Sequence, residues 1–81
     1  MNEEKKRRNS LLASLAFAGG ASVARELRGE LEAVHNVACT LDRVRADLRW
    51  LADIGALLLD GDRVLLTAEG REHVDRLREL F

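Results

Sequence analysis

The chain has 81 residues, of which 47% are hydrophobic and 33% are charged, and its formal net charge is −1. These values predict one small globular domain over residues 1–81 and exclude wholesale disorder. Dedicated nucleic-acid binders are usually basic, because phosphate neutralisation supplies most of their affinity. The charge is uneven, however: residues 1–18 carry four cations and two anions, so they sum to +2, and the remainder sums to −3.

Apolar residues recur at helical spacing in four segments. This spacing predicts helices over about residues 4–18, 22–34, 41–54 and 68–80. Residues with capping chemistry stand where these helices are expected to begin, and they are Ser22, Thr40 and Thr67. Residues that tolerate a left-handed backbone stand where the first three helices are expected to end, and they are Gly19-Gly20, Asn36 and Gly55.

The buried faces of the two middle helices follow from the same spacing. The second helix is expected to bury Val23, Leu27, Leu31 and Val34, and the third Leu41, Val44, Leu48 and Leu51. In the fourth helix the apolar positions are Val74, Leu77 and Phe81. Each helix therefore presents one apolar face to a shared core.

Between the third and fourth helices the period changes. Two short apolar runs flank Asp60-Gly61-Asp62 and predict a β-hairpin over about residues 57–66. A turn at Gly61-Asp62 places Leu59 opposite Val64 and Leu57 opposite Leu66, with these four side chains on one face. Leu58 and Leu65 then share the other face.

The element order predicts a winged helix-turn-helix. This mainly α-helical fold has a three-helix core, a two-stranded wing that covers the core, and a C-terminal helix. The run "LDRVRADLRWLADIGALLLDGDRVLLTAEGREHV" resembles the winged-helix segment of small proteins from Mu-like transposable bacteriophages and prophages. The matching residues are Asp42, Arg43, Val44, Arg45, Asp47, Leu48, Trp50, Leu51, Ala52, Gly55, Leu66, Thr67 and Gly70.

The resemblance implies a phage or prophage protein in the cytoplasm of a bacterial host, and it names no mechanism. The chain departs from the family at Ala68-Glu69-Gly70-Arg71, where Glu-Arg-Gly is usual, and this removes a cation from the foot of the wing. The single cysteine, Cys39, is also typical of a reducing compartment. The longest apolar stretch, residues 11–24, is too short to span a bilayer, so no membrane association is predicted.

A DNA-binding role has candidate residues in three places. They are Lys5, Lys6, Arg7 and Arg8 at the start of the chain, Thr40, Arg43 and Arg49 on the third helix, and Arg63 in the wing. A second interpretation remains open. The three arginines of the third helix can pair with its three aspartates, as Arg45–Asp42, Arg43–Asp47 and Arg49–Asp53, and leave a neutral surface.

Other chemistry has little support in the sequence. Trp50 is expected to pack under the wing beside Leu57 or Leu65, with a partner-binding role as the alternative. No pattern of catalytic residues or metal ligands occurs, so the protein is predicted to be no enzyme and to bind no metal or cofactor.

Two functions therefore stay open. The first is a phage transcriptional regulator that binds double-stranded DNA, and the second is a winged helix that binds a host or phage protein. A homodimer is also predicted, with Leu77, Leu80 and Phe81 near its interface, because the end of the fourth helix carries apolar residues with little to cover them.

Overall fold

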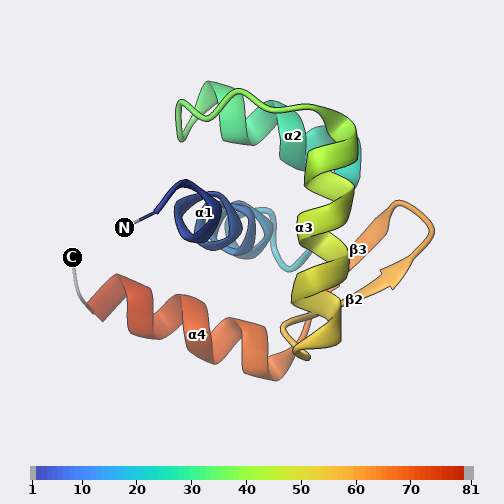
Figure 1. Cartoon of the computed structure of the whole chain (residues 1–81). Helices are drawn as coiled ribbons and strands as arrows, with labels where there is room; N and C mark the ends of the chain where they lie inside the picture. The colour runs from blue at the N-terminus through green and yellow to red at the C-terminus, as the bar shows by residue number, and fades with distance from the viewer. Residues whose placement is uncertain (1, 80–81) are drawn as a thin grey trace.

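The structure is a computed structural model that describes the backbone of residues 2–79 and the side chains of residues 2–77. Its elements in chain order are α1 (Glu3–Phe17), β1 (Ala21–Val23), α2 (Ala24–Ala33), α3 (Leu41–Asp53), β2 (Leu57–Asp60), β3 (Arg63–Leu66) and α4 (Ala68–Glu79). α1 lies between α2 and α4, while α3 stands at one side with the hairpin behind it (Figure 1). Among the described helices, none has the length and apolar content needed to cross a membrane.

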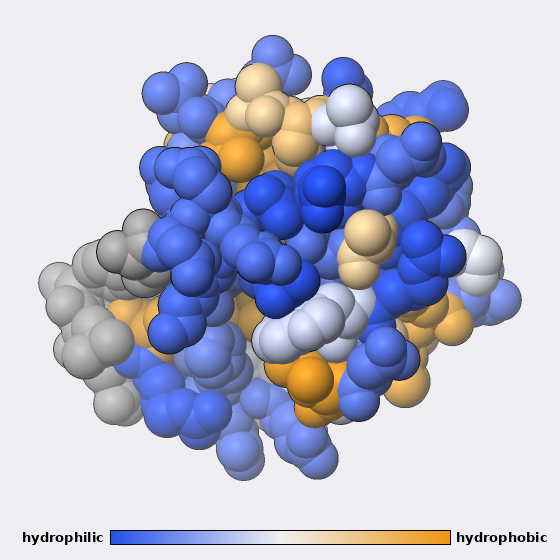
Figure 2. Space-filling model, in the orientation of Figure 1, coloured by the Kyte–Doolittle hydropathy of each residue, from blue (hydrophilic) through white to orange (hydrophobic). Residues whose placement is uncertain are grey.

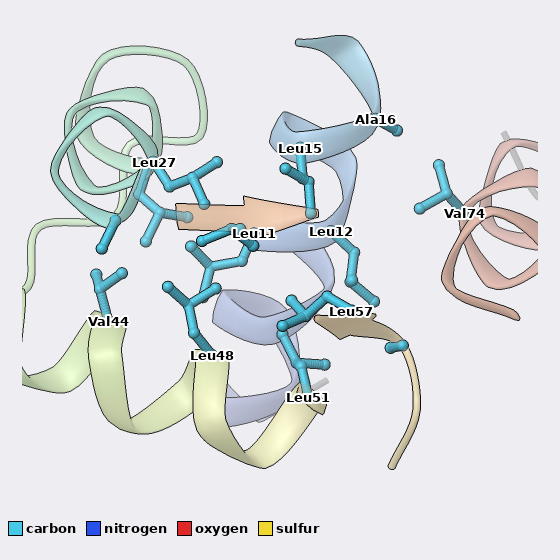
Figure 3. Close-up of a cluster of buried hydrophobic side chains, with 14 residues drawn as sticks. Leu11, Leu12, Leu15, Ala16, Leu27, Val44, Leu48, Leu51, Leu57 and Val74 are labelled. Carbon is cyan, nitrogen blue, oxygen red and sulfur yellow. The ribbon is translucent and has the colours of Figure 1, made fainter. Parts of the chain in front are cut away.

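The core forms around α1. Leu11, Leu12 and Leu15 are almost completely buried and meet leucines of α2 and α3 (Figure 3). Val74 of α4 approaches Ala16 from the other side of α1. The helical spacing of these residues explains the arrangement, because each apolar face is covered only when the helices pack together.

The hairpin has the predicted register. Leu57 faces Leu66 and Leu59 faces Val64, around a turn in which Gly61 has φ 60°. Leu57 and Val64 are buried, whereas Leu58 and Leu65 are exposed on the outer face of the sheet. The burial of one face therefore selected the register, as the alternation of apolar residues predicted.

The prediction that Ser22 caps the second helix is wrong. Residues 21–23 form β1, which pairs antiparallel with β3, so the sheet has three strands and not two. The free edge of β3 provides the reason: its backbone groups need partners, and Leu66 N–H also donates to Gly20 O at 2.7 Å. α2 then begins after Val23, which makes no side-chain cap.

The other predicted helix ends are confirmed. Thr40 Oγ1 accepts the Arg43 N–H at 3.1 Å, and Thr67 Oγ1 accepts the Gly70 N–H at 3.0 Å. Gly55 has φ 83°, and the hydrogen bonds that follow α3 have the Schellman pattern. Asn36 has φ 57° and turns the chain after α2, as expected. Val34, predicted to be buried, is exposed because α2 ends at Ala33.

Candidate nucleic-acid interface

The outward face of α3 is the surface that a helix-turn-helix presents to a ligand. At 100° per residue, Ala46 lies at the middle of this face, with Arg43 on one side and Arg49 on the other. Both arginines are exposed, and within residues 2–77 neither forms an ion pair. The predicted pair Arg49–Asp53 is therefore not formed. Asp42 and Asp53 are exposed on the same face, so among the described residues Arg43 and Arg49 are its two unpaired cations, at either side of a small central side chain.

The surroundings of Asp47 differ most from the predicted site. Its side chain is 1% exposed and is held by two arginines of α1. Arg7 donates to both carboxylate oxygens, with Nη2 3.1 Å from Oδ1, and Arg8 Nε lies 3.2 Å from Oδ1. The predicted surface pair Arg43–Asp47 is therefore wrong. The hydrogen bond to Asp47 raises the pKa of Arg7, so the Arg7 guanidinium group stays charged.

This cluster changes the charge of the helix surface. The sequence of α3 carries three arginines and three aspartates, but Asp47 is buried and neutralised by α1. The exposed and half-exposed charges of α3 are Arg43, Arg45 and Arg49 against Asp42 and Asp53, so they sum to three minus two, or +1. Arg45 is itself paired with Asp62 of the wing turn, so within the part of the chain that the structure describes the unpaired cations on the outward face of α3 are Arg43 and Arg49.

Arg7 and Arg8, two of the residues predicted to contact DNA, belong to this cluster. The guanidinium groups of Arg7 and Arg8 hold Asp47, and Arg8 also donates to Glu4 at 2.7 Å. Lys5 and Lys6 stay exposed on α1. Lys5 borders a groove with Trp50, and Lys6 borders a different groove between α1, α2 and α4, so the four cations do not form one basic surface with α3.

Trp50 does not pack under the wing as predicted. Its side chain is 43% exposed and lies on the α1 side of α3. The Arg8 guanidinium stacks on its ring, with Cζ 3.9 Å from the ring centroid. The space under the hairpin is filled by leucines of the hairpin and by Leu51. Trp50 instead packs against Arg8, which holds Asp47.

The wing turn is tied to α3 by a further ion pair. Arg45 Nε and Nη2 donate to the two carboxylate oxygens of Asp62 at 3.0 and 2.8 Å. Arg45 also lies 3.8 Å from Asp42, which confirms one of the predicted surface pairs. This bidentate geometry fixes the turn against the helix. The tip of the hairpin is acidic, since Asp60 and Asp62 outnumber Arg63.

The wing attachment is expected to depend on pH. The hydrogen bond from Arg45 lowers the pKa of Asp62 below its ordinary value of 3.8. Because the folded pKa is depressed, the contribution of the pair is fully present above about pH 4 and is lost as pH falls through the folded value. NMR titration of the Arg45 Nε–H signal should show this loss only below pH 4. An unchanged signal in Asp62→Asn would contradict the pairing.

Arg25 is a surface cation that the sequence did not single out. It lies exposed in the first turn of α2, and its charge contributes to the lowered pKa of Asp62. The wing turn and the start of α2 are therefore neighbours, and Ala24 N–H donates to Asp62 O at 2.9 Å. One signal could have pointed to Arg25: in a helix-turn-helix the first helix of the motif crosses the DNA backbone, and α2 is that helix.

The predicted residues therefore fall into separate groups. Arg43 and Arg49 lie on α3 and Thr40 caps it, and Arg63 is exposed on β3 beside the turn. Leu77 is half-buried on α4, whereas Leu80 and Phe81 lie outside the described residues. Figure 2 shows a mainly hydrophilic surface on the side where α3 is seen, with hydrophobic residues in small separate patches.

Comparison with known proteins identifies the class of fold. No protein-family model matches the chain, and no curated protein matches it. Among solved structures it is similar to F93 from STIV, described as a winged-helix DNA-binding protein. That likeness has a TM-score of 0.75 and 20% sequence identity, and it covers 100% of this chain and 91% of F93. The chain therefore has a winged-helix fold.

Proposed function

We propose that the protein binds double-stranded DNA through α3 and acts as a transcriptional regulator. The observation that carries this proposal is the burial of Asp47 by Arg7 and Arg8, which removes one of the three aspartates of α3 from its exposed face and, among residues 2–77, leaves Arg43 and Arg49 unpaired there. The description of F93 as a DNA-binding protein of the same fold supports it. The resemblance to proteins of Mu-like phages supports a phage or prophage setting in a bacterial cytoplasm.

In the proposed complex, α3 enters the major groove. Its first turn, with Thr40 and Arg43, faces base edges, because the start of a recognition helix reaches deepest into the groove. Arg49 and Arg25 lie where they neutralise phosphates on either side of the groove. The acidic hairpin tip is repelled by phosphate, and its attachment to Arg45 holds it beside the helix.

This mode of binding is tested by removing the two free arginines of α3. Arg43→Ala/Arg49→Ala should weaken binding to a short duplex, and the slope of log K against log salt should fall by about 0.9 for each phosphate that is no longer neutralised. Fluorescence anisotropy over a salt series measures both quantities. Arg71→Ala/Arg76→Ala, which removes two exposed arginines of α4, is the matched control. Equal losses in the two variants would mean that only overall charge matters.

A homodimer is also part of the proposal. One nearly neutral module has few phosphate contacts, whereas two modules held together gain affinity from effective concentration. Two-fold dimers are the commonest oligomers, and they match the symmetry of paired DNA half-sites.

A second candidate function is binding to another protein without DNA. The observation that favours it is the outer face of the sheet, where Leu58 and Leu65 pair across the strands and are 60% and 50% exposed. A DNA-binding wing has no need of two exposed leucines there. Two results together would replace DNA binding by this function. The wild-type chain would capture a host or phage protein but bind no duplex at low salt, and Leu58→Asp/Leu65→Asp would abolish the capture.

A further inference from the structure

An apolar groove lies on the part of the molecule that the α3 face does not use. It occupies about 480 Å³ between α1, the end of α2 and α4. Its apolar lining consists of Ala13, Phe17, Val34, Val74 and Leu77. Phe17 and Val34 are 87% and 65% exposed, although both are large hydrophobic residues. A contiguous apolar hollow with a polar rim is typical of an interaction surface.

The rim of this groove carries one charge of each sign. Lys6 of α1 and Glu30 of α2 both border it and are both exposed. Among residues 2–77 neither of them forms an ion pair. The face therefore offers a free cation and a free anion together, and this pattern complements a surface that has the same pair.

We propose that this groove is the docking surface for a second copy of the chain, related by a two-fold axis. In such an interface each subunit uses the same patch, so the patch must complement itself. This patch does so twice. Phe17 projects beside a hollow that is large enough to admit the Phe17 side chain of the partner, and Lys6 meets the partner's Glu30. A partner with charges of one sign would leave Lys6 or Glu30 unmatched.

The inference rests on the proposed homodimer and gives it a surface. Leu77, predicted at the interface from the sequence, lines the groove, but the projecting residues Phe17 and Val34 come from α1 and the end of α2. No residue of α3 or of the hairpin lines the groove, so docking there leaves both α3 faces open. The dimer therefore presents two DNA-binding helices at once.

Sedimentation equilibrium of the full chain without DNA tests the surface. The wild type should have twice the single-chain mass of 9.0 kDa at micromolar concentration. Phe17→Asp and Val34→Asp should each weaken dimerisation by about thirtyfold, the effect expected of a hot-spot residue. Leu58→Asp, at an exposed hydrophobic residue outside the groove, is the control and should stay dimeric. Both groove residues are exposed, so circular dichroism should show a native fold.

Charge reversal gives an independent result. Lys6→Glu should weaken the dimer, and adding Glu30→Lys should restore it, because the two changes re-create the opposite charges across the axis. A wild-type mass of one chain would overturn the proposal, and so would a dimer unaffected by Phe17→Asp and Val34→Asp. Sedimentation is measured without DNA, so its result does not depend on DNA binding. A dimer that then fails to bind a duplex would contradict only the proposed DNA binding. A DNA-binding monomer would contradict this surface and the proposed homodimer, and would leave DNA binding intact.

Discussion

Gly70→Ala should destabilise the protein by about 3 kcal/mol, at the upper end of the range for overpacking a buried site. Gly70 is buried in the first turn of α4, where the helix rests against Ala56, between α3 and β2. A Cβ at this position would overlap the carbonyl oxygen of Ala56 and lie 2.8 Å from Leu66 Cδ1. The backbone carbonyl has little freedom to move, because it accepts the Thr67 N–H at 3.2 Å.

The same substitution at Gly29 is the matched control. Gly29 lies in the interior of α2, it is exposed, and a Cβ there would meet nothing within 4 Å. Gly29→Ala should therefore stabilise the protein by about 0.5–1 kcal/mol, because alanine restricts the unfolded chain and favours helix. Urea unfolding of both variants gives the comparison. A loss at Gly29 as large as that at Gly70 would show that close packing of α4 is not the cause.

Asp47→Ala should destabilise the protein by about 3 kcal/mol, the lower end of the range for breaking a buried ion pair. The change leaves Arg7 and Arg8 without the carboxylate that both of them contact, and their side chains are only 14% and 19% exposed. The expected loss of stability is at the lower end of the range because this residual exposure lets water reach the guanidinium groups.

Asp53→Ala on the same helix separates this effect from helix propensity. Asp53 is exposed in the last turn of α3, where a carboxylate opposes the helix dipole. Its replacement should change stability by less than about 0.5 kcal/mol. Denaturant midpoints for the two variants provide the measurement. Similar values for both would mean that the Asp47 cluster contributes nothing specific to the fold.

Much of the fold was predictable because the deciding interactions are local. Thr40, Thr67 and Gly55 act within one turn of their own helices, and the register of the hairpin follows from which of its leucines must be buried. β1 was not predictable in this way. Three residues show no alternation, and the reason that they form a strand is the free edge of β3, which lies about forty residues later in the sequence.

The site was less predictable than the fold. Asp47 lies 39 and 40 positions from the arginines that bind it, so helical spacing indicated only its neighbours on α3. The sequence predicts Trp50 under the hairpin, because nothing in it indicates that Arg8 reaches the ring. Both errors concern contacts between α1 and α3, and together they explain why the surface charge of α3 was underestimated.

DNA binding through α3 is tested most directly by amide chemical shifts of the isotope-labelled protein during titration with a short duplex. We expect the largest changes at the start of α3, from Thr40 to Ala46, and at Arg25 in the first turn of α2. These changes should diminish as salt is added, because the contacts release counterions. An unchanged spectrum at low salt, or changes confined to α1 and α4 around the groove, would contradict the proposal.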